Sequence, residues 1–125
     1  DPVARADWRG AADRVRAATG AGALAVVAPP HQLLPLAYHL SPEAFADQRR
    51  LAERLRAERV IALASPGDLV AMLPPSPPPV LVVMTEASAT RHADLAAALA
   101  AGGLAPVASE RLEGLVLLRF ARAGG

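Results

Sequence analysis

The side chains of this sequence that could do chemistry follow its short apolar segments. Imidazole, carboxylate and hydroxyl groups are the types that move protons or hold a small polar ligand. Open α/β sheets bind ligands at the carboxyl ends of their strands. The residues directly after the predicted strands are therefore the candidate ligand-binding set: His31, Gln32, Ser65, Asp68, Thr85 and Glu86, with Pro30 beside them.

No residue of this set stands in a catalytic motif. Ser65 and Ser88 both follow apolar segments, but neither lies in the Gly-x-Ser-x-Gly pattern of a nucleophile elbow. Glu86 could act as a general acid or base, and the polarity of a turn explains it equally well. The set therefore follows from the expected topology alone, and we predict no catalytic residue.

Metal and cofactor sites are not predicted either. The chain has no cysteine, which excludes thiolate chemistry, disulfides and Cys-based zinc sites. His31 and His39 are separated by a proline and do not form a ligand pair on one helical face. Gly20-Ala21-Gly22 precedes an apolar segment, whereas a dinucleotide fingerprint must follow a strand and open a helix. We expect no metal and no cofactor.

Composition limits the partners. The net charge is +1, and acidic residues are interleaved with the 13 arginines, so no basic face predicts nucleic-acid binding. No apolar run reaches the ~20 residues that a bilayer-spanning helix needs, so we expect no direct membrane insertion by this segment. Hydrophobic residues make up 53% of the chain, but 30 residues are alanine, so the core must come mainly from 18 leucines and 11 valines.

Alternating helices and strands must position the candidate site. Asp7 is a good helix N-cap and Gly20 a good helix stop, which predicts a helix over residues 8–20. Ser41, followed by Pro42, predicts a second helix reaching about Glu58. Buried strands are expected at 23–28, 59–64 and 80–84; shorter helical segments are expected within 31–40, through 69–73, and over 91–101 with Thr90 as cap.

This order of elements indicates one α/β domain over residues 1–125. The fold class we expect is a three-layer Rossmann-like sheet of mostly parallel strands, with right-handed crossovers between them. Residues 105–120 form an antiparallel hairpin around Glu113-Gly114 at the sheet edge. We expect the strand order 2-1-3 with the hairpin beside the third strand. Residues 74–79 hold five prolines and form a stiff, extended connection.

Several segments resemble a known family. They are Asp7-Trp8-Arg9-Gly10-Ala11-Ala12, residues 23–30, residues 36–40 and residues 110–120. They are similar to the soluble C-terminal domain of bacterial membrane glycosyltransferases of family 39, the dolichyl-phosphate-mannose–protein mannosyltransferase group. In that family a segment beginning Asp-Trp-Arg runs into a helix and a strand followed by proline. A hairpin of the form Glu-Arg…Gly-Val…Leu-Arg-Phe or Tyr frequently ends the domain.

The resemblance implies an extracytoplasmic domain, periplasmic or on the cell surface, tethered to the inner membrane by the transmembrane part of its own parent chain. In such enzymes an acidic pair in a membrane-proximal loop of the N-terminal half catalyses transfer from a polyprenyl-phosphate sugar donor. No residue here matches that half, so no catalytic residue is carried over. We expect a non-catalytic accessory domain that positions an acceptor glycan or protein, or stabilises the membrane part. The resemblance also implies that the chain is excised from a larger polytopic protein. The first residue is Asp1 and not Met, which by itself indicates a processed product or an excised fragment.

Two other functions stay open. The chain could be a free-standing domain that binds a nucleotide or sugar phosphate near His31 and Glu86, a hypothesis that rests on topology. It could also be a protein-interaction module that uses the proline segment or the exposed hairpin edge, since an unpaired edge strand is a ready pairing surface.

Overall fold

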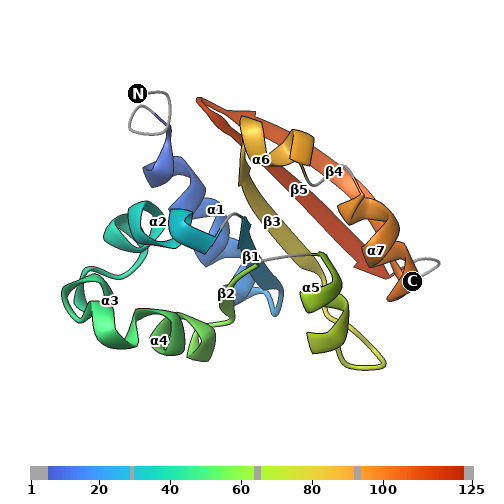
Figure 1. The fold of residues 1–125 in the computed structure, drawn as a ribbon, viewed down its shortest axis with the longest axis horizontal. Coiled ribbons are helices and arrows are strands. Elements are labelled where there is room, and N and C mark those ends of the chain that lie inside the picture. Colours follow the sequence, from blue (N-terminus) through green and yellow to red (C-terminus); the bar gives the residue numbers. More distant parts are fainter. Residues whose placement is uncertain (1–5, 29, 64–65, 92–93, 123–125) are drawn as a thin grey trace.

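The computed structural model describes residues 6–28, 30–63, 66–91 and 94–122. A five-stranded sheet runs through the molecule in the order β2-β1-β3-β5-β4 (Figure 1). Its strands are β1 (Leu24–Ala28), β2 (Val60–Ala62), β3 (Val80–Thr85), β4 (Leu104–Leu112) and β5 (Leu115–Arg122). The helices are α1 (Trp8–Gly20), α2 (Leu33–Leu40), α3 (Pro42–Ala46), α4 (Leu51–Ala57), α5 (Pro66–Met72), α6 (Glu86–Arg91) and α7 (Leu95–Ala101), with 3₁₀ turns η1 (Pro30–Gln32) and η2 (Gln48–Arg50).

The predicted strand order is confirmed, but the sheet is mixed rather than mostly parallel. β1 pairs in parallel with β2 and with β3, whereas β5 pairs antiparallel with both β3 and β4. The hairpin strands are 9 and 8 residues long, longer than any of the parallel strands. A two-residue turn permits this pairing, because antiparallel neighbours need no crossover. Gly114 supplies the positive φ of 72° that the turn requires.

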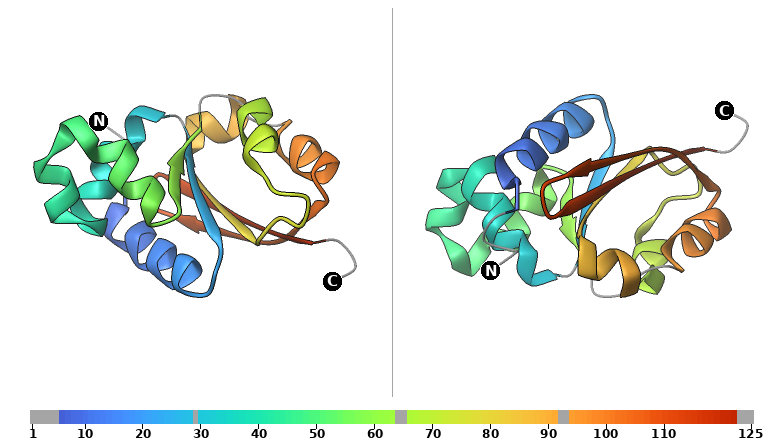
Figure 2. Two further views of the ribbon diagram at one scale, coloured as in Figure 1. Left: turned by 90° about the horizontal axis from the view of Figure 1, so that it is seen from below. Right: turned by 90° about the horizontal axis from the view of Figure 1, so that it is seen from above.

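Helices cover both faces of the sheet, so the expected three layers are present (Figure 2). One core cluster joins α1, α2 and α4 to side chains such as Leu81 and Val83 of β3. The other joins α5 and α7 to Val82 and Met84 of the same strand. All six residues of β3 are buried, as expected for a central strand with both faces covered. Among the described helices, none combines the length and apolarity needed to cross a membrane.

The first helix forms as its sequence predicts. The Asp7 carboxylate accepts a hydrogen bond of 2.8 Å from the backbone N–H of Gly10, which satisfies a free donor of the first turn. The buried face of α1 has helical spacing and consists of Trp8, Gly10, Ala11, Ala12, Val15 and Ala18. Small residues dominate this face, and they allow α1 to lie close to the sheet and to α2.

Two helix predictions are wrong. The helix expected from Pro42 to Glu58 is broken: α3 ends at Ala46, Asp47 adopts φ −111° and ψ 77°, and α4 begins only at Leu51. Thr90 does not cap a helix, because it lies inside α6, and α7 begins at Leu95. The reason is that a helical turn already starts at the end of β3, where Thr85 accepts a hydrogen bond from the Ser88 backbone.

The outer strand β4 has a neighbour on one side only. Its register shifts between Pro106 and Ala108, and the intervening Val107 is 61% exposed. A bulge, a proline without an N–H donor and the charged side chains of Glu110 and Arg111 all weaken an edge as a template for another strand. The sequence of this edge therefore opposes strand addition.

Candidate functional site

The segments that carry the candidate set lie at one edge of the sheet. β1, β2 and β3 are parallel and in register, so their carboxyl ends share that edge. η1 follows β1, α5 follows β2 and α6 follows β3 (Figure 1). The hairpin turn joins them, because the Glu86 N–H donates to the Gly114 carbonyl at 3.4 Å. The expected topology of the site is thus present.

Thr85 has a local structural role at this edge. It is the last residue of β3 and is 8% exposed. Its Oγ1 accepts a hydrogen bond of 3.2 Å from the Ser88 backbone N–H, itself part of a buried residue. This contact begins α6. The hydroxyl therefore satisfies a backbone donor that would otherwise be costly to bury.

Glu86 lies on the surface and is engaged by the hairpin. Its Oε1 is 3.6 Å from Nη1 of Arg111, and both side chains are more than half exposed. An ion pair of this kind adds little stability because water and salt screen it. The carboxylate is held beside β4 and remains open to solvent.

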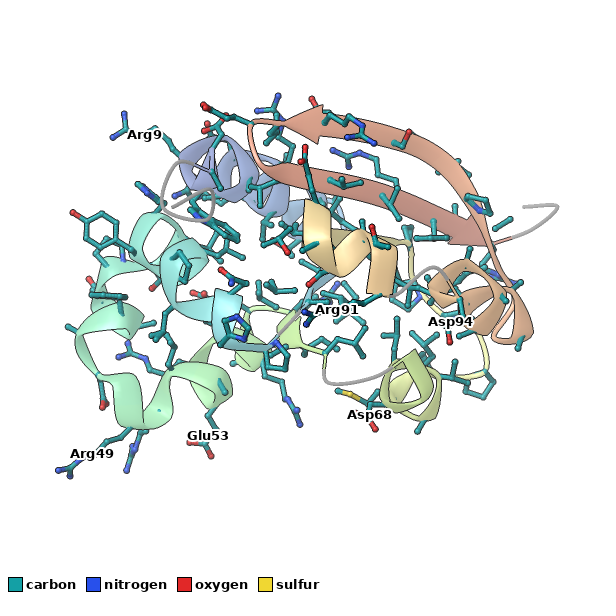
Figure 3. The ribbon with its side chains drawn as sticks, turned by 45° about the horizontal axis from the view of Figure 1, so that its top comes forward. Arg9, Arg49, Glu53, Asp68, Arg91 and Asp94 are labelled. Carbon is teal, nitrogen blue, oxygen red and sulfur yellow. The ribbon has the colours of Figure 1, made fainter. Side chains whose placement is uncertain are left out.

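The other members of the set differ in exposure. His31 is exposed on η1, Gln32 is 6% exposed beside it, and Asp68 is exposed in the first turn of α5. Figure 3 shows Asp68 extending outward from α5, away from Arg91 at the end of α6. Ser65 lies outside the described residues. The structure thus brings the segments to one edge, and their proposed shared ligand stays a prediction.

The start of α1 is bound to the hairpin at the same edge. The Asp7 N–H donates to the Glu113 carbonyl at 2.9 Å. About two turns further along α1, Arg14 forms a two-pronged ion pair with Glu110 of β4, through Nη2 at 2.9 Å and Nε at 3.2 Å. The hydrogen bond and charge of Arg14 lower the pKa of the Glu110 carboxyl, and Glu110 in turn raises the pKa of Arg14. We call this arrangement the α1–hairpin junction.

A cavity lies at the opposite edge, where β1 and β2 begin. It measures about 800 Å³ and is broadly open to solvent. Its walls are the ends of α1, α2 and α4 and the start of β2, and it is lined by Arg16, Thr19, Gly20, Ala21, Gly22, Leu40, Ala57, Glu58, Arg59 and Val60. None of these residues belongs to the candidate set predicted from the sequence.

The sequence contained one signal for this cavity. A helix commonly ends on glycine or asparagine, whereas α4 is followed by Glu58 and Arg59. Arg59 adopts a φ of 67° and, among the described residues, is the one non-glycine with positive φ. A charged residue at the position where glycine is common is thus the sequence feature that lies at this cavity.

Within the described part of the chain, no group of three or more histidine or acidic side chains is placed to hold a metal ion. All buried side-chain nitrogen and oxygen atoms of these residues have a hydrogen-bond partner.

Comparisons with known proteins add little. No protein-family model matches the chain, and no curated protein sequence matches it. One solved structure to which it is similar is an O-methyltransferase from neocarzinostatin biosynthesis, in complex with S-adenosylmethionine and 2-hydroxy-5-methyl naphthoic acid. The identity is 16% and the TM-score 0.42, with 84% of this chain and 50% of that chain covered. The chain thus spans half the length of that enzyme, and a likeness at this level carries no argument about function.

Proposed function

We propose that this chain is a non-catalytic, extracytoplasmic accessory domain of a bacterial membrane glycosyltransferase similar to family 39. It stabilises the transmembrane part of its parent protein or positions the acceptor glycan or protein beside it. The catalytic residues and the polyprenyl-phosphate sugar donor belong to the membrane part. The proposal rests on the resemblance of the sequence segments and on one structural observation, the α1–hairpin junction.

The junction supports the proposal because it joins the two ends of the resemblance. Asp7-Trp8-Arg9 and the hairpin from Glu110 to Phe120 are more than ninety positions apart in the sequence. In the structure the Asp7 N–H donates to the Glu113 carbonyl, and Arg14 pairs with Glu110. Two of the four segments that carry the resemblance are therefore in direct contact, as expected if they serve one purpose.

The junction also gives the proposed domain an orientation. α1 runs antiparallel to β1, so it begins at the carboxyl edge of the sheet, beside the hairpin turn (Figure 1). A membrane part that precedes Asp1 would connect to the domain at this edge of the sheet. η1, the start of α6 and the turn at Glu113-Gly114 would then be the surfaces nearest to it.

The proposal is tested in the full-length parent protein. We expect deletion of residues 1–125 to lower sugar transfer in membranes at least about tenfold, which corresponds to the loss of ~1.4 kcal/mol of positioning free energy. The isolated domain should transfer no sugar. Full activity of the truncated membrane part, present at the normal level, would reject both the positioning and the stabilising role.

A pair of charge reversals tests the orientation. Arg9 is exposed in the first turn of α1, and Arg49 is exposed on η2, away from the junction (Figure 3). Arg9→Glu should reduce sugar transfer several-fold, whereas the matched Arg49→Glu should leave it unchanged. Equal effects of the two substitutions on sugar transfer would contradict the proposed orientation of the domain. The accessory function itself would still be tested by the deletion.

A further inference from the structure

The cavity at the amino edge of the sheet has the features of an anion-binding site. We propose that it binds a small organic anion, whose phosphate or carboxylate group lies between the guanidinium groups of Arg16 and Arg59. This inference is independent of the proposed membrane role. It also differs from the ligand site expected at His31 and Glu86, which lies at the other edge of the sheet.

The two arginines are fixed on different walls of the cavity. Arg16 belongs to α1; its Nη1 is 3.0 Å from Asp13 Oδ1, and its Nη2 donates to the His39 carbonyl at the end of α2. Arg59 precedes β2, and its Nη1 donates to the Gly22 carbonyl at 3.2 Å. Each guanidinium is thus held by a backbone carbonyl from another segment. Side chains already ordered in this way lose little entropy when a ligand binds.

Free donors remain on both groups. A guanidinium has five N–H donors, and the contacts of Arg59 within the described chain use only Nη1. Its Nε and Nη2 can therefore form the two parallel bonds that match phosphate or carboxylate geometry. Arg16 uses both Nη atoms and retains Nε. Both residues line the cavity, so each can offer its remaining donors to an anion bound there.

The electrostatic balance of the cavity permits an anion. Three helix ends face it, and exposed carbonyls at helix C-termini repel negative charge. These carbonyls are largely satisfied: the Ala21 N–H donates to α1 carbonyls, the Glu58 N–H to α4 carbonyls, and Ser41 to Ala37 of α2. The lining carries two guanidinium groups and the carboxylate of Glu58, and Arg16 is already paired with Asp13 at 3.0 Å. Arg59 is the guanidinium of the lining that forms no ion pair among the described residues, so it is the main source of positive charge for an anion.

The rest of the lining indicates the size and character of the ligand. Gly20, Ala21 and Gly22 present mostly backbone, so a ligand can approach this turn closely. Leu40, Ala57 and Val60 add an apolar wall. An anion with a compact, partly apolar body, such as a phosphomonoester or a dicarboxylate, fits this combination better than inorganic phosphate alone.

The backbone of Arg59 gives independent support. Its left-handed φ of 67° is disfavoured for any residue with a Cβ, and glycine would adopt it without strain. The side chain that stands there instead projects across the cavity to Gly22. Strain retained at a cavity wall is typical of a functional position.

The test is a titration of the whole chain by amide NMR at low ionic strength, with inorganic phosphate, glycerol 3-phosphate and succinate as separate probes. We expect saturable shifts at the amides of Gly20, Gly22 and Val60, with a Kd of about 1 mM or tighter for the best probe. Arg16→Gln and Arg59→Gly should each raise that Kd at least about tenfold, as expected for loss of charge-assisted bonds. Arg59→Gly keeps the left-handed backbone, so its fold is preserved.

Arg49→Gln is the matched control, because Arg49 is exposed on η2 and does not line the cavity. It should leave the Kd unchanged. The proposal is overturned if none of the three probes gives saturable shifts at these amides, or if Arg49→Gln weakens binding as much as the cavity variants do. A ligand that shifts amides near His31 and Glu86 instead would place the binding site at the opposite edge.

Discussion

Replacing Gly10 by alanine should stabilise the domain only when Asp7 is also removed. Gly10 lies in the first turn of α1, and alanine adds up to about 0.5–1 kcal/mol of stability over glycine, the value for a helix interior. A Cβ on Gly10 would lie 2.9 Å from Asp7 Cγ and closer still to Oδ2. These are the atoms of the N-cap that accepts the Gly10 N–H. The added methyl group must therefore displace the cap.

The expected free energies follow from these two effects. Asp7→Ala alone should cost about 1 kcal/mol, the usual value for loss of an aspartate N-cap. Gly10→Ala in the wild-type background gains helix propensity and loses the cap, so its net effect should be near zero or slightly destabilising. In the Asp7→Ala background nothing remains to displace, and the full gain of about 0.5–1 kcal/mol should return. The coupling between the two positions is thus about 1 kcal/mol.

Urea denaturation of the four proteins of this double-mutant cycle measures the coupling. Gly20→Ala serves as the control, because a Cβ there meets no atom within 4 Å, and it should change stability equally in both backgrounds. Asp94→Ala is a second control: Asp94 stands at the N-cap position of α7 without a side-chain cap bond and should cost clearly less than Asp7→Ala. If Gly10→Ala stabilises equally with and without Asp7, the cap geometry described here is wrong.

Three further predictions concern the junction, the candidate edge and the core. The pKa of the Glu110 carboxyl should lie below the ordinary glutamate value of 4.5 and should return toward that value in Arg14→Gln, which ¹³C NMR titration of both proteins checks. Because the folded pKa is lowered, the contribution of Glu110 to stability is present above the unfolded pKa and is lost as pH falls through the folded pKa. Thr85→Val should lower the free energy of unfolding by about 1–3 kcal/mol, because the Ser88 N–H loses its acceptor, whereas Thr85→Ser should lower it less. Equal losses of unfolding free energy in urea denaturation would show that the hydroxyl does not cap α6. Leu36→Ala should lower the free energy of unfolding by about 2–5 kcal/mol because Leu36 is fully buried. Leu34→Ala should lower it far less because Leu34 is 39% exposed. Similar melting temperatures for the two variants would contradict the packing of α2.

The sequence predicted the parts of the fold that depend on local patterns. Asp7 and Gly20 bound α1 as expected, because capping chemistry and helical spacing agree there. The apolar runs before Pro29 and after Pro79 became the buried strands β1 and β3. Glu113-Gly114 became the hairpin turn because glycine can adopt the positive φ that it needs.

The errors arose where tertiary contacts decide the backbone. The break at Asp47 lies within a continuous helical pattern. Ala44, Leu51 and Leu55 have the spacing of one helical face and are all buried, so the apolar pattern does not distinguish one long helix from the separate helices α3 and α4. The sheet is mixed because β5 pairs antiparallel with both β3 and β4, over six and eight residue pairs, whereas the parallel pairing of β1 with β2 covers three.

For the candidate site, the sequence predicted which segments lie at the carboxyl edge of the sheet, but not how their side chains are arranged. Parallel strands carry their carboxyl ends to one edge, so the position of η1 and α6 followed from the strand order. The cavity at the other edge was not predicted, because Arg16 and Arg59 are far apart in sequence and resemble ordinary surface charges. Their convergence depends on where three helices end, which no local pattern encodes.

The coding sequence upstream of the Asp1 codon tests the central claim most directly. An accessory domain of a membrane glycosyltransferase should be preceded by several apolar segments of about 20 residues each, with an acidic pair in the first outward-facing loop. A start codon or a short signal peptide directly before Asp1 would contradict the accessory-domain function and leave a free-standing ligand-binding domain as the alternative.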